Sequence, residues 1–500
     1  MPTRDPVSWT ATLSRYAKKG LFKEALNVFR DMLHAGIKAN EFTYGSALMS
    51  CAKLKWLGTG KQVQGCVEKS GFMGNLFVQS ALVDLHCKCG CIEDASYVFG
   101  SMNERDLVSW NGMIGGFAVN GFATESFVTF RSMLREGLSP DHFTLGSLLG
   151  SCNQGLHRFN VQRIHAFALQ LGFESHARLG AQLVDAYAKC GSISDSSNIF
   201  ESIPEKDVLS YTAMINGYAH EAKHVATAFI LFAATHRSGI EMDDVLLCSM
   251  LNICANRVSL KLGRLIHGVA IKYCPGYDVA MSNALIDMYA KCGELEEAQR
   301  AFDEQDEKNI ISWSSLIGGY AQHGYGGKAI AIFKRMENEG VKPNHVTVLS
   351  LLFGCSQTGL VSDGLTIFKS MTSKYDISPR VKHYSCMIDL LARGGHIDEA
   401  AYLIHEMNIE PSPSMWGAVL GSCMIHMNVS LGETAARQLF YLDPENCSYY
   451  VGVSGLYAGM GVWDSAAMTR TQIQDMNLKK VVGCSNSLVT TGDRLALRQS

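Results

Sequence analysis

The sequence is poor in proline and has no long apolar run. Ten prolines among 500 residues leave no proline-rich linker, and no low-complexity tract or block of like charges separates compact domains. No apolar run reaches the roughly 18 residues that a membrane-spanning helix requires, so we expect no membrane insertion. With 47% hydrophobic and 18% charged residues, the chain has ample apolar material for a continuous core. We therefore expect one extended, ordered body.

A disulfide framework is also lacking. The sixteen cysteines show no short-spaced pattern, and most, such as Cys254, Cys355 and Cys423, have apolar, helix-forming neighbours. We expect them to be small buried residues in a reducing compartment. The formal net charge of −3 is unusual for a nucleic-acid binder, which normally needs a cationic face. Stacking and polar base contacts can nevertheless keep positive charge local to one surface.

What the sequence has is a long repeat. A Ser-aromatic dipeptide recurs at intervals of 101, 101 and 102 residues, ending at Trp9, Trp110, Tyr211 and Trp313. A Lys-Cys-Gly triplet recurs with the same spacings of 101 and 102 residues, at 88–90, 189–191 and 291–293. Whole segments therefore recur. Each block divides into units of 35, 35 and 31 residues, such as 6–40, 41–75 and 76–106.

Each unit is predicted to be a pair of helices. In the unit 107–141 two apolar stripes follow helical spacing, formed by Trp110, Met113, Ile114 and Phe117, and then by Ala123, Phe127, Phe130 and Met133. Asn120-Gly121 and Gly137 supply the stops. One hairpin cannot bury both stripes, so successive hairpins must share a core. We predict an all-α fold, a right-handed α-solenoid superhelix of stacked helix-turn-helix repeats with a long concave groove.

The sequence pattern of these units resembles that of the pentatricopeptide repeat family. Asp-Met-Tyr-Ala-Lys-Cys-Gly at 287–293 and Gly-Val-Lys-Pro-Asn at 340–344 are close to the family's usual segments, and the 35/35/31 alternation is similar to its plant PLS class of P, L and S units. The resemblance covers nearly the whole chain. It implies an array at 6–412 that binds single-stranded RNA, preceded at 1–5 by the end of a truncated S unit.

In this family each unit meets one nucleotide through its fifth and last residues. An Asp acceptor suits the N–H of guanine or uracil, an Asn donor suits adenine or cytosine, a small fifth hydroxyl leaves room for a purine, and a fifth Asn fits a pyrimidine. The implied pairs are Thr10 with Asn40 for A, Ser80 with Asp106 for G, Asn111 with Asp141 for U, Thr212 with Asp243 for G, Asn283 with Asn309 for C (then U), and Ser314 with Asn344 for A.

No base can be assigned to the other units from their fifth and last residues. Ala181 with Asp207 lacks the usual fifth residue, and the L units carry Gly45, Gly146, Cys248 and Leu349 there. The predicted site is A-n-G-U-n-n-G-n-C-A, read 5′ to 3′, where n marks an undecoded unit. Asn and Asp at unit ends are also ordinary cap and turn residues. Their joint fit to allowed pairs in six units favours base recognition.

The C-terminal segment resembles the E extension of the same class. Val-Lys-His-Tyr-Ser at 381–385 leads to Met-Trp-Gly at 415–417, Asp-Pro-Glu-Asn at 443–446 and Gly-Cys-Ser at 483–485, in the family's order. The resemblance implies an E extension at 413–485 and a short tail at 486–500. It also implies an adaptor toward an editing deaminase, although the segment could equally cap the apolar end of a solenoid.

The deaminase domain that follows this extension in many relatives is missing here. The sequence has no His-x-Glu and no Cys-x-x-Cys segment, so the zinc ligands and proton-shuttling glutamate of that chemistry are absent. We expect the deaminase to come from another chain. At the other end, residues 1–5 match the unit endings 102–106 and 203–207. We expect that upstream repeats and a transit peptide for an organelle, with the mitochondrion favoured over the chloroplast, are not part of this sequence.

Three short motifs favour an enzyme at first sight. His220-Glu-Ala-Lys-His224 matches a zinc-binding His-Glu-x-x-His pattern, but it lies where the first helix of its unit should turn into the second. The alternating cysteines at 87, 89 and 91 fit no common zinc spacing. The Gly-Lys pairs at 60–61 and 327–328 lack the residues that flank a phosphate-binding loop. We expect no catalytic residue, metal or cofactor.

Three functions follow from these observations. The first is an organellar specificity factor for C-to-U RNA editing that recruits a deaminase in trans and its editing-complex partners. The second is an RNA stabilisation, splicing or translation factor that acts by occupancy alone. The third is a protein-binding scaffold, which would have no reason to restrict its fifth and last residues to the allowed pairs.

Overall fold

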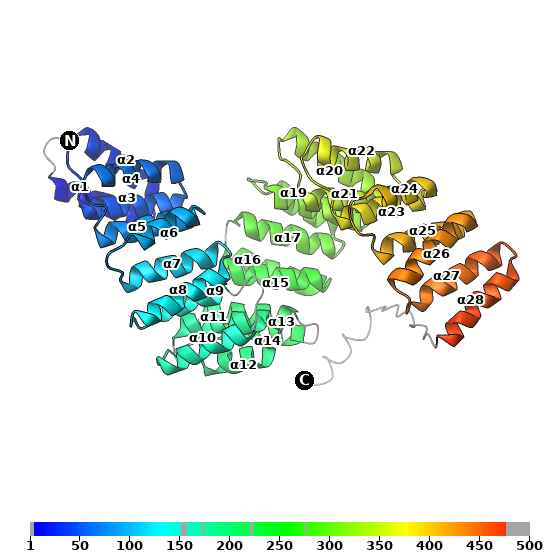
Figure 1. The fold of residues 1–500 in the computed structure, drawn as a ribbon, viewed down its shortest axis with the longest axis horizontal. Coiled ribbons are helices and arrows are strands. Elements are labelled where there is room, and N and C mark those ends of the chain that lie inside the picture. Colours follow the sequence, from blue (N-terminus) through cyan, green and yellow to red (C-terminus); the bar gives the residue numbers. More distant parts are fainter. Residues whose placement is uncertain are drawn as a thin grey trace. The chain divides into compact units, whose positions relative to one another are not determined.

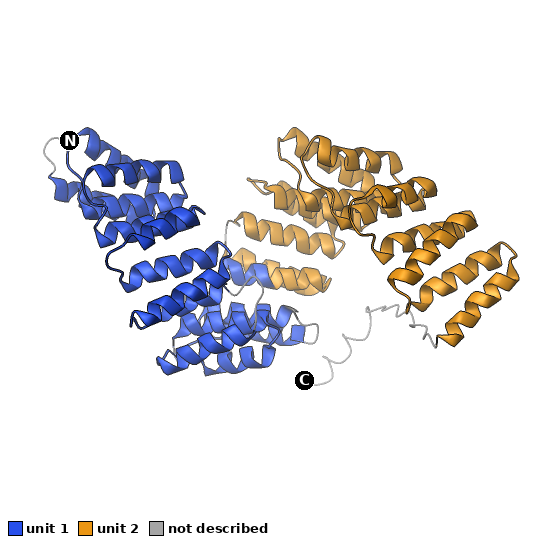
Figure 2. Cartoon of the chain, in the orientation of Figure 1, with its two compact units in different colours: residues 1–249 blue, residues 250–500 orange. Residues whose placement is uncertain are grey.

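The structure, a computed structural model, describes residues 5–151, 158–173, 176–220, 224–274, 276 and 278–476. These residues form 28 helices and no strand. They divide into two compact units, Met1–Ser249 and Met250–Ser500 (Figure 2). The predicted all-α fold of stacked helix-turn-helix repeats is confirmed. Residues 1–4, the motif at 483–485 and the tail at 486–500 lie outside the described residues.

The helices follow one another as hairpins (Figure 1). In the first unit they pair as α1 (Pro6–Lys18) with α2 (Phe22–His34), α3 (Glu41–Leu54) with α4 (Leu57–Lys69), α5 (Leu76–Lys88) with α6 (Ile92–Gly100), α7 (Leu107–Val119) with α8 (Ala123–Arg135), α9 (His142–Ser151) with α10 (Arg158–Gln170), α11 (Ala177–Lys189) with α12 (Ile193–Ser202), and α13 (Val208–His220) with α14 (Val225–Arg237).

The division between the units falls within α15 (Asp244–Asn256). The series continues with α16 (Leu260–Tyr273), α17 (Val279–Lys291) with α18 (Leu295–Asp303), α19 (Ile310–Gln322) with α20 (Gly326–Asn338), α21 (His345–Thr358) with α22 (Val361–Ser373), α23 (Val381–Arg393) with α24 (Ile397–Glu406), α25 (Pro413–His426) with α26 (Val429–Leu442), and α27 (Cys447–Gly459) with α28 (Trp463–Asp475).

Local sequence explains where these helices begin and end. In the unit 107–141, Asp106 caps α7 by accepting a hydrogen bond from the Ser109 amide at 2.8 Å. The helix ends at Val119, and Gly121 has a φ of 84°, a left-handed conformation that favours glycine. The predicted stop at Asn120-Gly121 is confirmed. The stop at Gly137, with a φ of 83°, is confirmed as well.

The first helix of each repeat packs against the first helix of the next. In the first unit this joins α1, α3, α5, α7, α9, α11 and α13, and in the second it joins α17, α19, α21, α23, α25 and α27. The even-numbered helices pack against these from the other side, as α2 does on α1 and α3. We call the side of the odd-numbered helices that lies away from their even-numbered partners the first-helix face.

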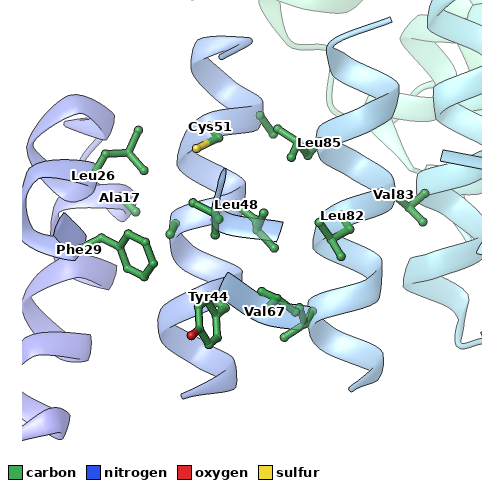
Figure 3. Close-up of a cluster of buried hydrophobic side chains, with 14 of the residues drawn as sticks. Ala17, Leu26, Phe29, Tyr44, Leu48, Cys51, Val67, Leu82, Val83 and Leu85 are labelled. Atoms are coloured by element: carbon green, nitrogen blue, oxygen red, sulfur yellow. The ribbon is translucent and has the colours of Figure 1, made fainter. Parts of the chain in front are cut away.

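The core lies between the two layers of helices. Figure 3 shows Leu26 and Phe29 of α2 facing Leu48 and Cys51 of α3, with Leu82 and Leu85 of α5 on the other side, and all of these side chains are buried. Fully burying a leucine contributes about 1.5–3 kcal/mol relative to leaving it in water. Each hairpin thus gains its stability from its neighbours, as the paired stripes predict.

Candidate nucleic-acid interface

All six predicted last residues are N-caps of the first helix of the following repeat. In each, a side-chain oxygen accepts a hydrogen bond from a backbone amide in the first turn of that helix. The bonds join Asn40 to Thr43, Asp106 to Ser109, Asp141 to Thr144, Asp243 to Leu246, Asn309 to Ser312, and Asn344 to Thr347. The capping interpretation is therefore confirmed for these positions. All six residues are half-buried or exposed, so capping does not remove them from the surface.

In two repeats a threonine hydroxyl bridges the fifth and last residues. The Thr43 hydroxyl lies 2.8 Å from the Thr10 hydroxyl and donates to Oδ1 of Asn40 at 2.7 Å. In the second unit the Thr347 hydroxyl lies 2.8 Å from that of Ser314 and donates to Asn344 at 3.0 Å. Each bridge holds the hydroxyl of the fifth residue close to the amide side chain of the last residue.

In two further repeats the fifth and last residues bond directly. Nδ2 of Asn111 donates to Oδ1 of Asp141 at 3.1 Å, and the Thr144 hydroxyl donates to both side chains, at 2.6 and 2.8 Å. Nδ2 of Asn283 donates to Oδ1 of Asn309 at 3.3 Å. Oδ1 of Asn283 is buried without a hydrogen-bond partner in the described part of the chain, so it is an acceptor that a ligand could satisfy.

The remaining two pairs are not bonded to each other in the described residues. The Ser80 hydroxyl donates to the carbonyl of Leu76, and the Thr212 hydroxyl donates to that of Val208. The third residue of the following repeat explains the difference. Ser109 donates its hydroxyl to the main chain of Asp106, and Leu246, after Asp243, has no hydroxyl. No threonine bridge can form at either step.

The hydrogen bonds of Asp141 also set its charge. Partial burial raises the pKa of this carboxyl, but the amide and hydroxyl of Thr144 and the amide of Asn111 outweigh that effect and hold the pKa below its ordinary value. Asp141 is therefore an ionised acceptor at neutral pH.

Sequence analysis missed a second set of residues on the first-helix face. The second residue of most units is apolar yet 46–69% exposed: Val7, Phe42, Phe77, Val108, Phe143, Leu209, Val245, Ile311 and Val346. Large exposed apolar side chains at one repeated position indicate a binding surface. Nucleic-acid bases stack on aromatic side chains and pack against aliphatic ones. The signal was present in the sequence. In the unit 107–141, Val108 lies outside the stripe that begins at Trp110.

Cations near this face are neutralised in the S units. The thirteenth residue of each S unit pairs with a carboxylate one helical turn earlier: Lys88 with Asp84 at 2.6 Å, Lys189 with Asp185 at 2.6 Å, Lys291 with Asp287 at 2.8 Å, and Arg393 with Asp389 at 3.0 Å. Val119 and Gln322 occupy the same position in P units and line hollows of the first-helix face. These four cations are therefore paired within the chain, and the first-helix face does not gain free positive charge from them.

The segment that matches a zinc-binding pattern lies at the boundary between two helices. The helix α13 ends at His220 and α14 begins at Val225, so the two histidines of the His-Glu-x-x-His segment do not share a helix, while residues 221–223 lie outside the described residues. No group of three metal-binding side chains occurs in the part of the chain that the structure describes. None of the described helices is long and apolar enough to cross a bilayer.

The predicted burial of the cysteines holds for some of those that the structure describes, whereas others, such as Cys190 and Cys292, are half-buried. Cys254, Cys355 and Cys423 are buried and free, and burial raises their thiol pKa values to about 12, 11 and 11. Burial likewise raises the pKa of Cys87 to about 12. A Cβ added at Gly116 would lie 2.1 Å from its Sγ, so Cys87 packs against that helix backbone. These protonated thiols fit the predicted packing role.

Comparisons with known proteins agree with this geometry. A PPR repeat family model matches residues 4–53 and 308–357, and a PPR repeat model matches 80–107, 108–138, 280–309, 346–375 and 382–409. A model of the E motif matches residues 426–487. The chain is 45% identical over 475 residues to pentatricopeptide repeat-containing protein At3g20730 of Arabidopsis thaliana, covering 94% of this chain and 84% of that protein.

Two other Arabidopsis relatives carry organelle names. The mitochondrial pentatricopeptide repeat-containing protein At2g03380 is 34% identical over 96% of this chain and 70% of its own length. The chloroplastic At1g11290 is 33% identical over 97% of this chain and 60% of its own length. The crystal structure of maize PPR10 superimposes with a TM-score of 0.55 at 16% identity, covering 96% of this chain and 75% of PPR10.

Proposed function

Because the chain belongs to the pentatricopeptide repeat family and carries an E motif, we propose that it binds a specific stretch of single-stranded RNA on its first-helix face. The observation that carries the proposal is the pairing of fifth and last residues in four repeats, by a direct hydrogen bond in two and through a threonine hydroxyl in two, beside a row of exposed apolar second residues. A base can stack on the apolar side chain while its Watson–Crick edge meets the polar pair.

Maize PPR10, whose fold the chain shares, has been crystallised in complex with an 18-nucleotide RNA element. For the chain described here the proposed site is A-n-G-U-n-n-G-n-C-A. The proposed readers are Thr10 with Asn40, Asn111 with Asp141, Asn283 with Asn309, Ser314 with Asn344, and the two unbonded pairs Ser80 with Asp106 and Thr212 with Asp243.

RNA binding by the purified chain tests this proposal. We expect an oligonucleotide with the proposed site to bind at least about tenfold more tightly than one with purines and pyrimidines exchanged, since one well-paired base edge is worth about 1–3 kcal/mol. Asp141→Asn should shift the preference at the fourth nucleotide from U to C, and Asn309→Asp should shift the ninth from C to U. Both changes keep an N-cap, because Asn and Asp cap helices about equally well.

Asp278→Asn is the matched control. Asp278 caps α17 through the Met281 amide at 2.8 Å, but it ends a unit whose fifth residue, Cys248, offers no base partner. This variant should leave the preference at every decoded nucleotide unchanged. Equal binding of the two oligonucleotides, or an unaltered fourth-nucleotide preference in Asp141→Asn, would refute base recognition by these pairs and favour a protein-binding scaffold.

The E motif extends the proposal to C-to-U editing, with a deaminase supplied in trans. What supports this role is exposed apolar surface on the hairpins of α25 to α28, where Ile425, Tyr441, Trp463 and Met468 are 69–83% exposed. Such side chains are typical of protein-binding surfaces. The names of the relatives support action in an organelle, and we propose the mitochondrion as the first candidate.

A further inference from the structure

The unit 142–176 has no fifth side chain, because Gly146 stands there, yet the first-helix face is hollowed at this step. A cavity of about 480 Å³ opens between the first helices α7, α9 and α11 of three successive repeats. Its walls include Gly115, His142, Gly146, Gly150, Arg178 and Gln182. The cavity lies wholly within the first unit.

The side chain of Gln182 takes the place of the missing fifth side chain. A Cβ added at Gly146 would lie 2.5 Å from Oε1 of Gln182, so the amide occupies the space that a fifth residue fills elsewhere. A Cβ added at Gly150 would meet nothing within 4 Å, and this second glycine leaves the floor of the hollow open. Gln182 is the sixth residue of the following unit, a position outside the fifth-and-last pairs.

Two polar side chains that line the hollow lack partners in the described part of the chain. Gln182 is half-buried and Arg178 is exposed, and neither has a hydrogen bond or ion pair to any residue that the structure describes. At one edge the rings of His142 and His176 stack with centroids 4.2 Å apart. The hollow therefore offers donors and an acceptor on one side and a flat aromatic edge on another.

The two other L units with described surroundings are built differently. At the equivalent step of the second unit a cavity of about 510 Å³ is lined by Leu349, Phe353 and Cys386 in place of the residues at 146, 150 and 182. At Gly45, an added Cβ would lie 2.1 Å from the ring of Phe77, so an aromatic side chain fills that place. Gln322 and Lys382 also line the hollow of the second unit. Among these three steps, however, only the one over Gly146 combines an empty fifth position with an amide side chain at the sixth position of the following unit.

We propose that the hollow over Gly146 binds a guanine base, recognised by Gln182 and Arg178 of the following repeat. The inference rests on the proposed function and assigns the first undecoded nucleotide after the predicted uracil, the fifth of the site. A purine fits a hollow that two glycines enlarge. Guanine presents two acceptors, O6 and N7, to the donor-only guanidinium of Arg178, whereas adenine places an amino donor beside N7. The Gln182 amide can accept from the N–H groups of the same base.

Binding of the full chain to four oligonucleotides that differ only at the fifth nucleotide tests this inference. We expect guanine to bind about tenfold more tightly than either pyrimidine. Gln182→Leu keeps the approximate size of the side chain without its hydrogen bonds and should bring the four affinities together. Gly146→Ala should do the same, because its Cβ displaces the flexible end of Gln182 while alanine favours the helix.

Cys386→Ala, at the same sixth position over Leu349 in the second unit, is the matched control and should keep the guanine preference. Arg178→Ala should weaken binding of the guanine oligonucleotide selectively. Equal weakening of all four would overturn its role in base recognition and assign it to a phosphate.

The fourth nucleotide separates this inference from the proposed function. If uracil is preferred there and Asp141→Asn changes that preference, but the wild-type chain binds all four fifth-nucleotide variants equally, the guanine site is overturned and RNA recognition stands. If no oligonucleotide binds, RNA recognition itself fails. Matching circular dichroism melting curves of the wild type, Gln182→Leu and Gly146→Ala show that a lost preference does not arise from unfolding.

Discussion

Asp141 shows how one residue serves the fold and the candidate interface together. One of its oxygens accepts from the amide and hydroxyl of Thr144, which caps α9, and the same oxygen accepts from Asn111 of the preceding repeat. Replacing a capping Asp by Ala costs about 0.5–2 kcal/mol. A binding defect in an alanine variant would therefore mix two causes, whereas the Asn variant retains the cap and isolates recognition.

His86 gives a prediction at the same scale. It is 1% exposed and its Nε2 lies 3.0 Å from Oε1 of Gln64. Burial lowers the pKa of His86, and Lys61 lowers it further, while Asp94 opposes them. In the unfolded chain the imidazole takes up a proton near its ordinary pKa of about 6.5, so the unfolded state binds more protons and stability falls as pH drops through that value. His86→Gln removes this contribution.

Thermal unfolding at pH 7.5 and pH 5.5 would measure the effect. The melting temperature of the wild type should fall more between the two conditions than that of His86→Gln. His396→Gln is the control, because His396 is exposed on the surface, where its Nδ1 lies 2.9 Å from Glu399. An identical pH dependence in the wild type and His86→Gln would show that His86 protonates without cost in the folded chain.

At the scale of the helical hairpin, glycine has two different roles. Gly137 ends α8 with a φ of 83°, and Gly65 lies inside α4 with nothing within 4 Å of an added Cβ. Gly137→Ala should destabilise the first unit by about 1–2 kcal/mol, since the left-handed conformation is costly for a residue with a Cβ. Gly65→Ala should stabilise it by about 0.5–1 kcal/mol through helix propensity.

Urea unfolding of the two variants, monitored by circular dichroism, would measure these opposite shifts. The same direction of change in both would contradict the assignment of conformational roles. The positions of such glycines explain why helix ends were predictable from the sequence. A capping Asp or Asn begins a helix and a glycine ends it, and both effects act within a few residues of the chain.

At the scale of the whole molecule, side chains of the E motif hairpins allow RNA binding and the proposed partner recruitment to be tested separately. Trp463 of α28 is 69% exposed and Tyr441 of α26 is 83% exposed, and neither belongs to a predicted nucleotide pair. In an editing assay with target RNA and an organellar extract, Trp463→Ala together with Tyr441→Ala should abolish conversion of the target cytidine. RNA affinity should stay within about twofold of the wild type, since exposed residues away from a contact add little to it.

Val7→Ala serves as the opposite control, because it lies on the first-helix face and should weaken RNA binding without removing the partner surface. Unchanged editing by the Trp463 and Tyr441 double variant would contradict a recruiting role for these side chains. Loss of transcript ends in cells that lack the protein, with editing intact, would instead favour an RNA-protecting factor that acts by occupancy.

The sequence by itself determined the repeat period, the order of helices and the residues that cap them, because these depend on contacts within a turn or a hairpin. It also identified the fifth and last residues of the six candidate pairs. Only the tertiary structure decided which pairs are joined, directly as in Asn283 with Asn309 or through a threonine such as Thr43. It also decided which side chain occupies the empty fifth positions. Phe77 covers Gly45 and Gln182 covers Gly146, across more than thirty residues of chain. Such contacts are set by how neighbouring hairpins pack, which no local pattern encodes.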